Sequence, residues 1–218
     1  MNSNLYVRPA TLLIAMVCTL TTPTVAKCET TVQSVNSSGS EVYALGPCRI
    51  KIANLFGGQF EVSDPASPRH GNYYLPDTGA EAAPVLRGFG FDCLDAPTTD
   101  TAEGLLGIRQ DGDRWLQKDR YDNWVPFTSG QHAKVFPMTG SNWSGLGVLV
   151  DDTTGDETQR VRTFKFCLVH TAKAICGETP VAVLAEPHSD EFAKSKAILQ
   201  TIEFVDEGST PTAGSQQQ

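Results

Sequence analysis

A stretch in the middle of the chain combines carboxylates with large aromatic side chains. Its acidic and aromatic members are Asp111, Asp113, Trp115, Asp119, Tyr121, Asp122 and Trp124. Two carboxylates can act as acid and as base or nucleophile in glycoside hydrolysis, which would fall to Asp111, Asp113 or Asp119. A sheet edge followed by a polar loop explains the same acids. Exposed Trp and Tyr side chains anchor protein interfaces, although a packed core uses them too. We interpret Trp115, Tyr121 and Trp124 as binding residues and keep glycan hydrolysis as an alternative.

A second acidic group lies in the segment DDTTGDE. It comprises Asp151, Asp152, Asp156 and Glu157. Carboxylate oxygens bind Ca²⁺, but the segment lacks the alternating oxygens and central glycine of an EF-hand. We therefore expect a solvated loop between two strands. Its charges keep a sheet edge soluble or bind a basic partner.

The other residues capable of chemistry do not form a catalytic pattern. The histidines are scattered, with no helical pair and no adjacent acid: His70, His132, His170 and His188. Ser144 lies in Asn-Trp-Ser-Gly, which is not the Gly-x-Ser-x-Gly turn of a serine nucleophile. A zinc site at Cys167, His170 and Cys176 would lack a fourth ligand at suitable spacing. The sequence predicts a protein without enzymatic activity, cofactor or metal.

The first 26 residues predict a cleaved secretory signal peptide. Arg8 precedes a compact apolar run over residues 11–20, and Thr24 and Ala26 occupy the small-residue positions of a cleavage site. The run is about ten residues long, too short for a membrane-spanning helix. We expect a mature protein that begins at Lys27, is periplasmic or secreted, and has no stable membrane insertion.

Export favours disulfides over metal ligation for the cysteines. Five of the six cysteines remain after the signal, because Cys18 lies within it. If residues 171–172 form a two-residue turn, Cys167 lies opposite Cys176 at a non-hydrogen-bonded pair. The Cα atoms are then about 4.5–5.5 Å apart, within disulfide range. A four-residue turn would separate the two cysteines.

The other three cysteines allow more than one pairing. We favour Cys48–Cys93, which leaves Cys28 as the odd thiol on the polar lead-in over 27–40. Between this lead-in and a disordered tail over 207–218 we expect a single domain over 41–206. The 218-residue chain is 40% hydrophobic and 19% charged, as globular proteins are.

Charge narrows the choice of partner. The formal net charge is -8, and loss of the signal, which carries one cation and no acid, would make it -9. A protein this acidic repels polyphosphates, so nucleic acid is an unfavourable ligand and a basic protein a favourable one.

Short extended segments dominate the expected domain. We expect a loop over 63–84, and the dipeptide Asp111–Gly112 predicts a hairpin. Ser189 is expected to cap a helix that carries Phe192, Leu199 and Ile202 on one apolar stripe. These features predict an α+β domain, an antiparallel sheet packed by a C-terminal helix and stapled by disulfides. The expected strands are 48–52, 59–62, 84–93, 104–108, 114–117, 123–127, 143–150, 160–170 and a stretch over 173–185 interrupted near Gly177 and Pro180.

The C-terminal part of the chain resembles the end of Mog1/PsbP-like domains. The matching segments are FKFCLVH, VAVLAE and KAILQTIEFVD. Ile198, Leu199, Ile202 and Phe204 match the family's pattern Ile-Leu-x-x-Ile-x-Phe. The resemblance implies an α/β/α sandwich with an antiparallel sheet, in a family of mostly non-enzymatic proteins that includes exported or lipid-anchored bacterial envelope proteins.

Together these features predict an exported protein that binds another, basic protein. The leading hypothesis is an immunity or inhibitor protein that neutralises a toxin or cell-wall hydrolase in the bacterial envelope. The alternatives are an envelope assembly or stress-response factor, and a glycan hydrolase that uses Asp111 and Asp113. The expected binding residues are Asp151, Asp152, Asp156, Glu157, Trp115, Tyr121 and Trp124.

Overall fold

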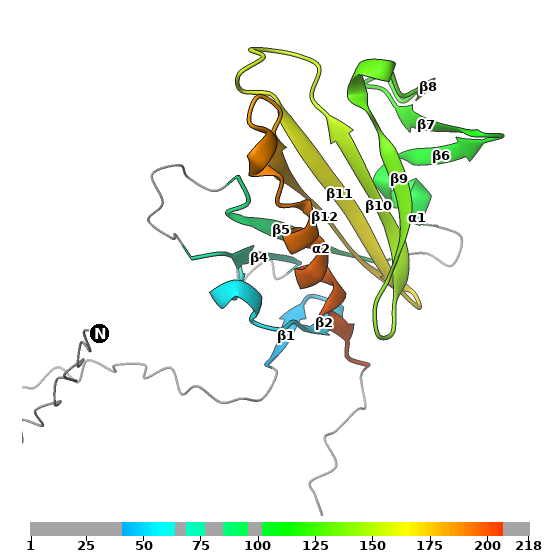
Figure 1. Ribbon diagram of the computed structural model, residues 1–218. Coiled ribbons are helices and arrows are strands. Elements are labelled where there is room, and N and C mark those ends of the chain that lie inside the picture. Colours follow the sequence, from blue (N-terminus) through cyan, green and yellow to red (C-terminus); the bar gives the residue numbers. More distant parts are fainter. Residues whose placement is uncertain (1–40, 64–68, 77–84, 96–101, 207–218) are drawn as a thin grey trace, which may run out of the picture. The chain divides into compact units, whose positions relative to one another are not determined.

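A computed structural model describes residues 41–63, 69–76, 85–95 and 102–206 of the chain (Figure 1). The predicted signal peptide, the lead-in, the tail and Cys28 lie outside the described residues. No helix in these ranges is long and apolar enough to cross a membrane.

The centre of the described domain is a seven-stranded sheet in which every neighbouring pair of strands is antiparallel. Two meanders, β3–β4–β5 and β9–β10–β11–β12, meet where β5 pairs with β12 over four residues. In spatial order the strands are β3 (Gln59–Val62), β4 (His70–Tyr74), β5 (Gly88–Asp95), β12 (Lys173–Val183), β11 (Val161–His170), β10 (Ser144–Asp151) and β9 (Lys134–Thr139).

Two three-stranded sheets and two α-helices complete the domain. The first small sheet contains β1 (Val42–Leu45), β2 (Cys48–Lys51) and β13 (Glu203–Phe204). The second contains β6 (Ile108–Asp111), β7 (Arg114–Lys118) and β8 (Trp124–Pro126). The helices are α1 (Ala102–Leu106) and α2 (Phe192–Gln200), with 3-10 turns η1 (Leu55–Gly57), η2 (Ser129–Gln131) and η3 (Pro187–Ser189). The predicted antiparallel sheet with a C-terminal helix is confirmed.

Strand alternation separates the two faces of the main sheet. On β11, Phe164, Phe166 and Leu168 are fully buried and share one face, because alternate residues point the same way. Helix α2 covers this face (Figure 1), and the ring of Phe192 lies 5.0 Å from that of Phe164. Lys165 points to the opposite face, where it lines a cavity together with Leu105 and Leu106 of α1. The two α-helices therefore lie on opposite faces.

Both predicted disulfides are confirmed. Cys48 is bonded to Cys93, and Cys167 to Cys176. The second bond follows the expected register, with His170 opposite Lys173 across a two-residue turn, and its Cα atoms are 4.1 Å apart. Because these sulfurs are bonded to each other, a zinc site through Cys167 and Cys176 is excluded.

Two secondary-structure predictions were wrong because tertiary packing overrode local preference. Residues 70–74, predicted to lie in a loop, form β4. Its Tyr73 is 1% exposed and donates a hydrogen bond to the carbonyl of Leu55 at 2.7 Å. Gly71 leaves room for the ring of Phe60, which a side chain would displace. Residues 104–106, predicted to be strand, belong to α1, which packs against β10 and β11.

Two details of the C-terminal region also differ from expectation. Strand β12 continues through Gly177, where no interruption is found. Next to Pro180 the pairing with β11 does shift, because Pro180 lies opposite Thr163 and Ala182 opposite Arg162. Pro180 is four residues along the strand from Cys176. Pair types alternate along an antiparallel ladder, so the Pro180–Thr163 pair is non-hydrogen-bonded, as the Cys176–Cys167 pair is. A proline is tolerated there because its backbone need not donate a hydrogen bond to β11. Ser189 does not cap α2, because its hydroxyl bonds the amide of Val183 at 2.8 Å and the carbonyl of Glu186 at 2.7 Å. Asp190 instead accepts from the amide of Phe192 at 2.9 Å.

Candidate functional site

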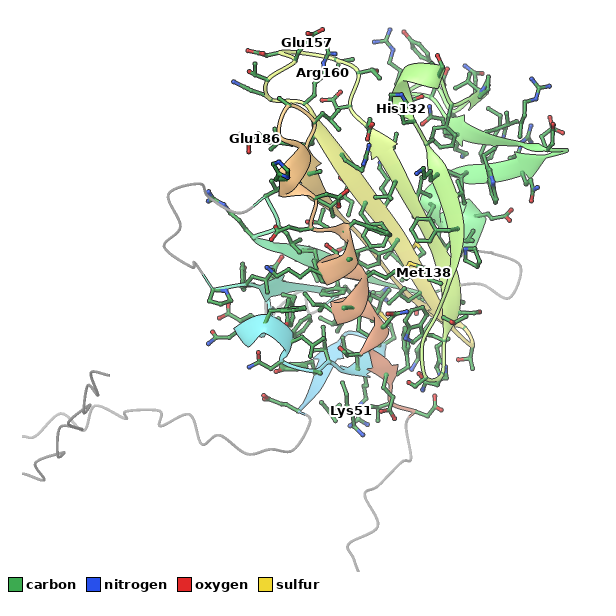
Figure 2. All side chains as sticks on the ribbon, in the orientation of Figure 1. Lys51, His132, Met138, Glu157, Arg160 and Glu186 are labelled. Atoms are coloured by element: carbon green, nitrogen blue, oxygen red, sulfur yellow. A yellow bond between two sulfur atoms is a disulfide. The ribbon has the colours of Figure 1, made fainter. Side chains whose placement is uncertain are left out.

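A cleft of about 990 Å³ opens at the end of the main sheet where β10 and β11 are joined by the loop over 152–160. This volume is at the upper end of the range for ligand sites, roughly 300–1,000 Å³. Leu149, Leu184 and Ala185 give it an apolar lining, and charged side chains complete its wall. Figure 2 shows His132, Glu157 and Arg160 at this end of the sheet and Lys51 at the other.

A buried ion pair lines the cleft. Asp151 ends β10 directly opposite Arg162 on β11, and its side chain is only 5% exposed. Its Oδ1 accepts from Nε of Arg162 at 2.6 Å and its Oδ2 from Nη2 at 2.9 Å. These hydrogen bonds hold the pKa of Asp151 below its ordinary value and raise that of Arg162, although burial opposes both shifts. The carboxylate is therefore ionised and cannot serve as a general acid near neutral pH.

His132 completes this group from a strained backbone position. Its φ of 41° lies in the left-handed region, where it ends the turn η2. Nδ1 lies 3.1 Å from Oδ2 of Asp151, while the side chain is 69% exposed. With Nδ1 directed to the carboxylate, Nε2 is left for solvent or a ligand. The strained backbone of His132, the buried carboxylate of Asp151 and the adjoining cleft make the cluster of Asp151, Arg162 and His132 the strongest candidate for a functional site in the described part of the chain.

Three of the four histidines, none of which has an acid next to it in the sequence, lie beside a carboxylate in the structure. Besides His132, His70 lies 2.8 Å from Asp92 and His170 lies 3.0 Å from Asp206. These acids are distant in sequence, so only the strand pairings and the C-terminal segment bring them close.

The acidic loop is internally hydrogen-bonded. Asp152 accepts from the amide of Thr154 at 2.9 Å, and Asp156 does the same for Thr158 at 2.9 Å. These backbone bonds lower the pKa of both carboxylates. Arg160 donates to the carbonyl of Gly155 at 3.1 Å.

The loop presents only part of the predicted acidic group to solvent. Glu157 has a side chain 85% exposed, and Asp152 and Asp156 are also exposed. Asp151 is a correction to the predicted set, because its side chain is buried and already bonded to Arg162.

The predicted aromatic residues divide between two faces of the β6–β7–β8 sheet. Trp124 pairs with Lys118 across β7 and β8, and Arg109 lies 4.7 Å above its ring. Trp115 is half-buried and points to the other face, because it is three residues from Lys118 on one strand. Tyr121 is 67% exposed. Tyr121 is therefore available to a partner, whereas Trp124 is half-buried like Trp115 and lies beside the cations of Arg109 and Lys118.

The acids of this sheet are not gathered in a cleft. Asp111 and Asp113 are exposed at the β6–β7 turn and do not line the large cleft. Asp119 accepts from the amides of Tyr121 and Asn123 at 2.8 and 2.9 Å, which stabilises the next turn. These hydrogen bonds give Asp119 a structural role, whereas Asp111 and Asp113 are exposed at their turn.

A second cavity lies between the acidic loop and the β6–β7–β8 sheet. It has a volume of about 420 Å³ and is lined by Lys118 from the small sheet and by Asp152 from the acidic loop. Of the predicted binding residues, Asp151 and Asp152 line this cavity, whereas Trp115, Tyr121 and Trp124 do not.

Sequence reasoning missed His132 and Arg162. The pairing of Arg162 with Asp151 was within reach, because predicted strands over 143–150 and 160–170 joined by one loop form a hairpin. His132 carries no local signal, since it comes from a separate turn.

Comparison with known proteins leaves the site to be interpreted from its own geometry. No protein-family model matches the chain, and no curated protein or solved structure matches it significantly. Within the described ranges, no group of three or more potential ligand side chains could hold a metal ion.

Proposed function

We propose that this protein is exported and binds a basic protein without catalysing a reaction. Neutralisation of a toxin or cell-wall hydrolase in the bacterial envelope is the specific role we favour. The observation that carries the proposal is the loop over 152–160, whose Asx turns and Arg160 contacts fix its shape before binding. A preorganised loop loses little conformational entropy on association.

Charge and surface shape support the same proposal. Asp152, Asp156 and Glu157 are exposed on this loop, and the chain carries a net charge of -8, which would steer a basic partner toward it. Trp124 and Tyr121 extend the surface beyond the second cavity, and Trp, Tyr and Arg side chains dominate binding energy at many interfaces.

Export and the finer fold also belong to this proposal. Two disulfides favour an oxidising compartment, as expected for a periplasmic or secreted protein. We infer a variant of the Mog1/PsbP-like sandwich, supported by α-helices on opposite faces of the sheet and by the closing segment with Ile198, Leu199 and Phe204 in the core. An experimental structure superposed on that family would test this inference.

The first experiment is to purify the tagged mature protein from the periplasm and identify co-purifying proteins by mass spectrometry. We expect one stoichiometric basic protein whose binding weakens as salt rises. A clean monomer without a partner would contradict the proposal. Recovery of several assembly components would favour the envelope-factor alternative instead.

A charge variant then tests the surface. The triple change Asp152→Asn, Asp156→Asn and Glu157→Gln removes three charges but keeps the side-chain oxygens that form the Asx turns. We expect at least a tenfold weaker complex. The control neutralises Glu61, Glu103 and Glu203, which lie outside the loop, and should leave affinity nearly unchanged. Equal affinity of both variants would show that the loop is the wrong surface.

A further inference from the structure

The interior of the 990 Å³ cleft differs chemically from its acidic rim. Strand register pairs Lys134 with Leu149 and Asp151 with Arg162, so all four side chains leave the sheet on the face covered elsewhere by α2. Leu149 is 9% exposed and, with Leu184, forms apolar surface beside these charges. The acids Asp152 and Glu157 belong to the loop at the rim.

The polar groups of the interior have unused donors and few unused acceptors. The two oxygens of Asp151 already face three nitrogen atoms, two from Arg162 and one from His132. On Arg162, Nη1 has only a 3.6 Å contact with Asp190. Lys134 lines the cleft from an exposed position, and its Nζ meets no hydrogen-bond acceptor among the residues that the structure describes.

The remaining cation of the cleft is already engaged. Arg160 donates to the carbonyls of Thr154 and Gly155 and lies 3.5 Å from Glu157. The unused donors are thus those of Lys134 and Arg162, next to an apolar wall. A planar carboxylate suits a guanidinium edge, an ammonium on the same face of the sheet adds a second cation, and an attached apolar group suits the leucines.

We propose that this cleft binds a carboxylate joined to an apolar group. The carboxylate contacts Arg162 and Lys134, and the apolar group packs on Leu149 and Leu184. Such a ligand is either a free amphiphilic carboxylate or the C-terminal carboxylate of a polypeptide that ends in an apolar residue. Binding requires no exposed acid of the loop, so the site goes beyond the proposed function and stands without it.

Titration of the full mature protein with defined probes tests the site. The probes are octanoate, octanol, and a short peptide ending in leucine with either a free or an amidated C-terminus, followed by calorimetry or by amide chemical shifts. We expect octanoate or the free-acid peptide to bind at least tenfold tighter than its uncharged counterpart. The tighter of the two acids identifies the source. Equal binding of charged and uncharged probes, or no binding of either acid, would overturn the proposal.

Variants connect the binding to the named side chains. Lys134→Met keeps the apolar stem but removes the charge, and we expect about a tenfold loss of carboxylate affinity with unchanged binding of the uncharged probe. Arg162→Lys, which keeps a cation beside Asp151, should also weaken carboxylate binding. Lys51→Met, at the opposite end of the domain (Figure 2), is the control. Unchanged carboxylate affinity in Lys134→Met would refute the assignment, even if Arg162→Lys fails to fold.

Discussion

Replacing Arg162 by methionine should destabilise the protein through the carboxylate that it leaves behind. The side chain of Asp151 is 5% exposed, and two charge-assisted hydrogen bonds at 2.6 and 2.9 Å would disappear. Removing one partner of a buried ion pair costs about 3–5 kcal/mol. Because the side chain of Arg162 is itself 31% exposed, we expect the lower end of that range. A loss of about 3 kcal/mol corresponds to a fall in Tm of roughly 6–12 °C for a chain of this size.

The assay is urea unfolding at pH 7 with both disulfides intact, followed by tryptophan fluorescence. The double variant Asp151→Leu with Arg162→Met is the control, because well-packed apolar side chains often replace a buried pair at little cost. We expect its stability to lie within about 1 kcal/mol of the original. A cost below about 1 kcal/mol for Arg162→Met alone is the value typical of exposed pairs, and it would refute the reasoning.

Low pH should reduce the loss of stability caused by Arg162→Met. The hydrogen bonds from Arg162 lower the pKa of Asp151 in the folded state below its unfolded value, which is about 3.9. The pair's contribution is therefore fully present above that unfolded value and lost as pH falls through the lowered pKa. The stability difference between the original protein and Arg162→Met should shrink below about pH 4, and a constant difference would show that another interaction is responsible.

Three further changes test the packing. The loop-closure entropy model assigns about 4 kcal/mol of stability to the disulfide Cys48–Cys93, whose sequence separation is 45, and about 2.5 kcal/mol to Cys167–Cys176, whose separation is 9. Replacing Cys48 and Cys93 by alanine should therefore lower the urea midpoint more than replacing Cys167 and Cys176. In Gly145→Ala the new Cβ would overlap the carbonyl oxygen of Cys167, and we expect a loss of stability of about 3 kcal/mol. The control Gly104→Ala lies in α1, where a Cβ meets nothing within 4 Å, and should be neutral or stabilising in the same assay. The side chain of Asn142 donates to the carbonyl of Phe204 at 2.7 Å and accepts from the amide of Phe204 at 3.0 Å. Asn142→Ala should therefore speed amide hydrogen exchange at Phe204 without changing exchange in β11. Faster exchange throughout the domain would contradict this local role.

Predictions from the sequence held where a local pattern contained the decisive information. Alternating side chains over 160–170 determine which residues of β11 face the core, and a two-residue turn after His170 sets the register of the cysteine pair. They failed where a distant residue decided the outcome. The stretch HGNYY has weak strand preference, yet it forms β4 because Tyr73 is buried and neighbouring strands pair with it.

The candidate site shows the same division. The sequence indicated the acidic loop, and its Asx turns are local hydrogen bonds between residues two apart. Its interpretation of Asp151 as a fourth exposed acid was wrong, because a residue at the end of a strand is buried or exposed according to the side chains that surround it. Here those are Arg162 across the hairpin and His132 from a separate turn.

By itself the sequence indicated many of the strands, the β11–β12 hairpin with its disulfide, and the acidic loop, since each depends on residues close together along the chain; it missed β1, β4 and β9. Only the tertiary structure determined which side chains pair with Asp151, which acids lie beside the histidines, and where the cleft lined by Leu149 forms. The physical reason is that a charge interacts with whatever lies within a few ångströms of it, and the folding of distant segments alone sets those distances.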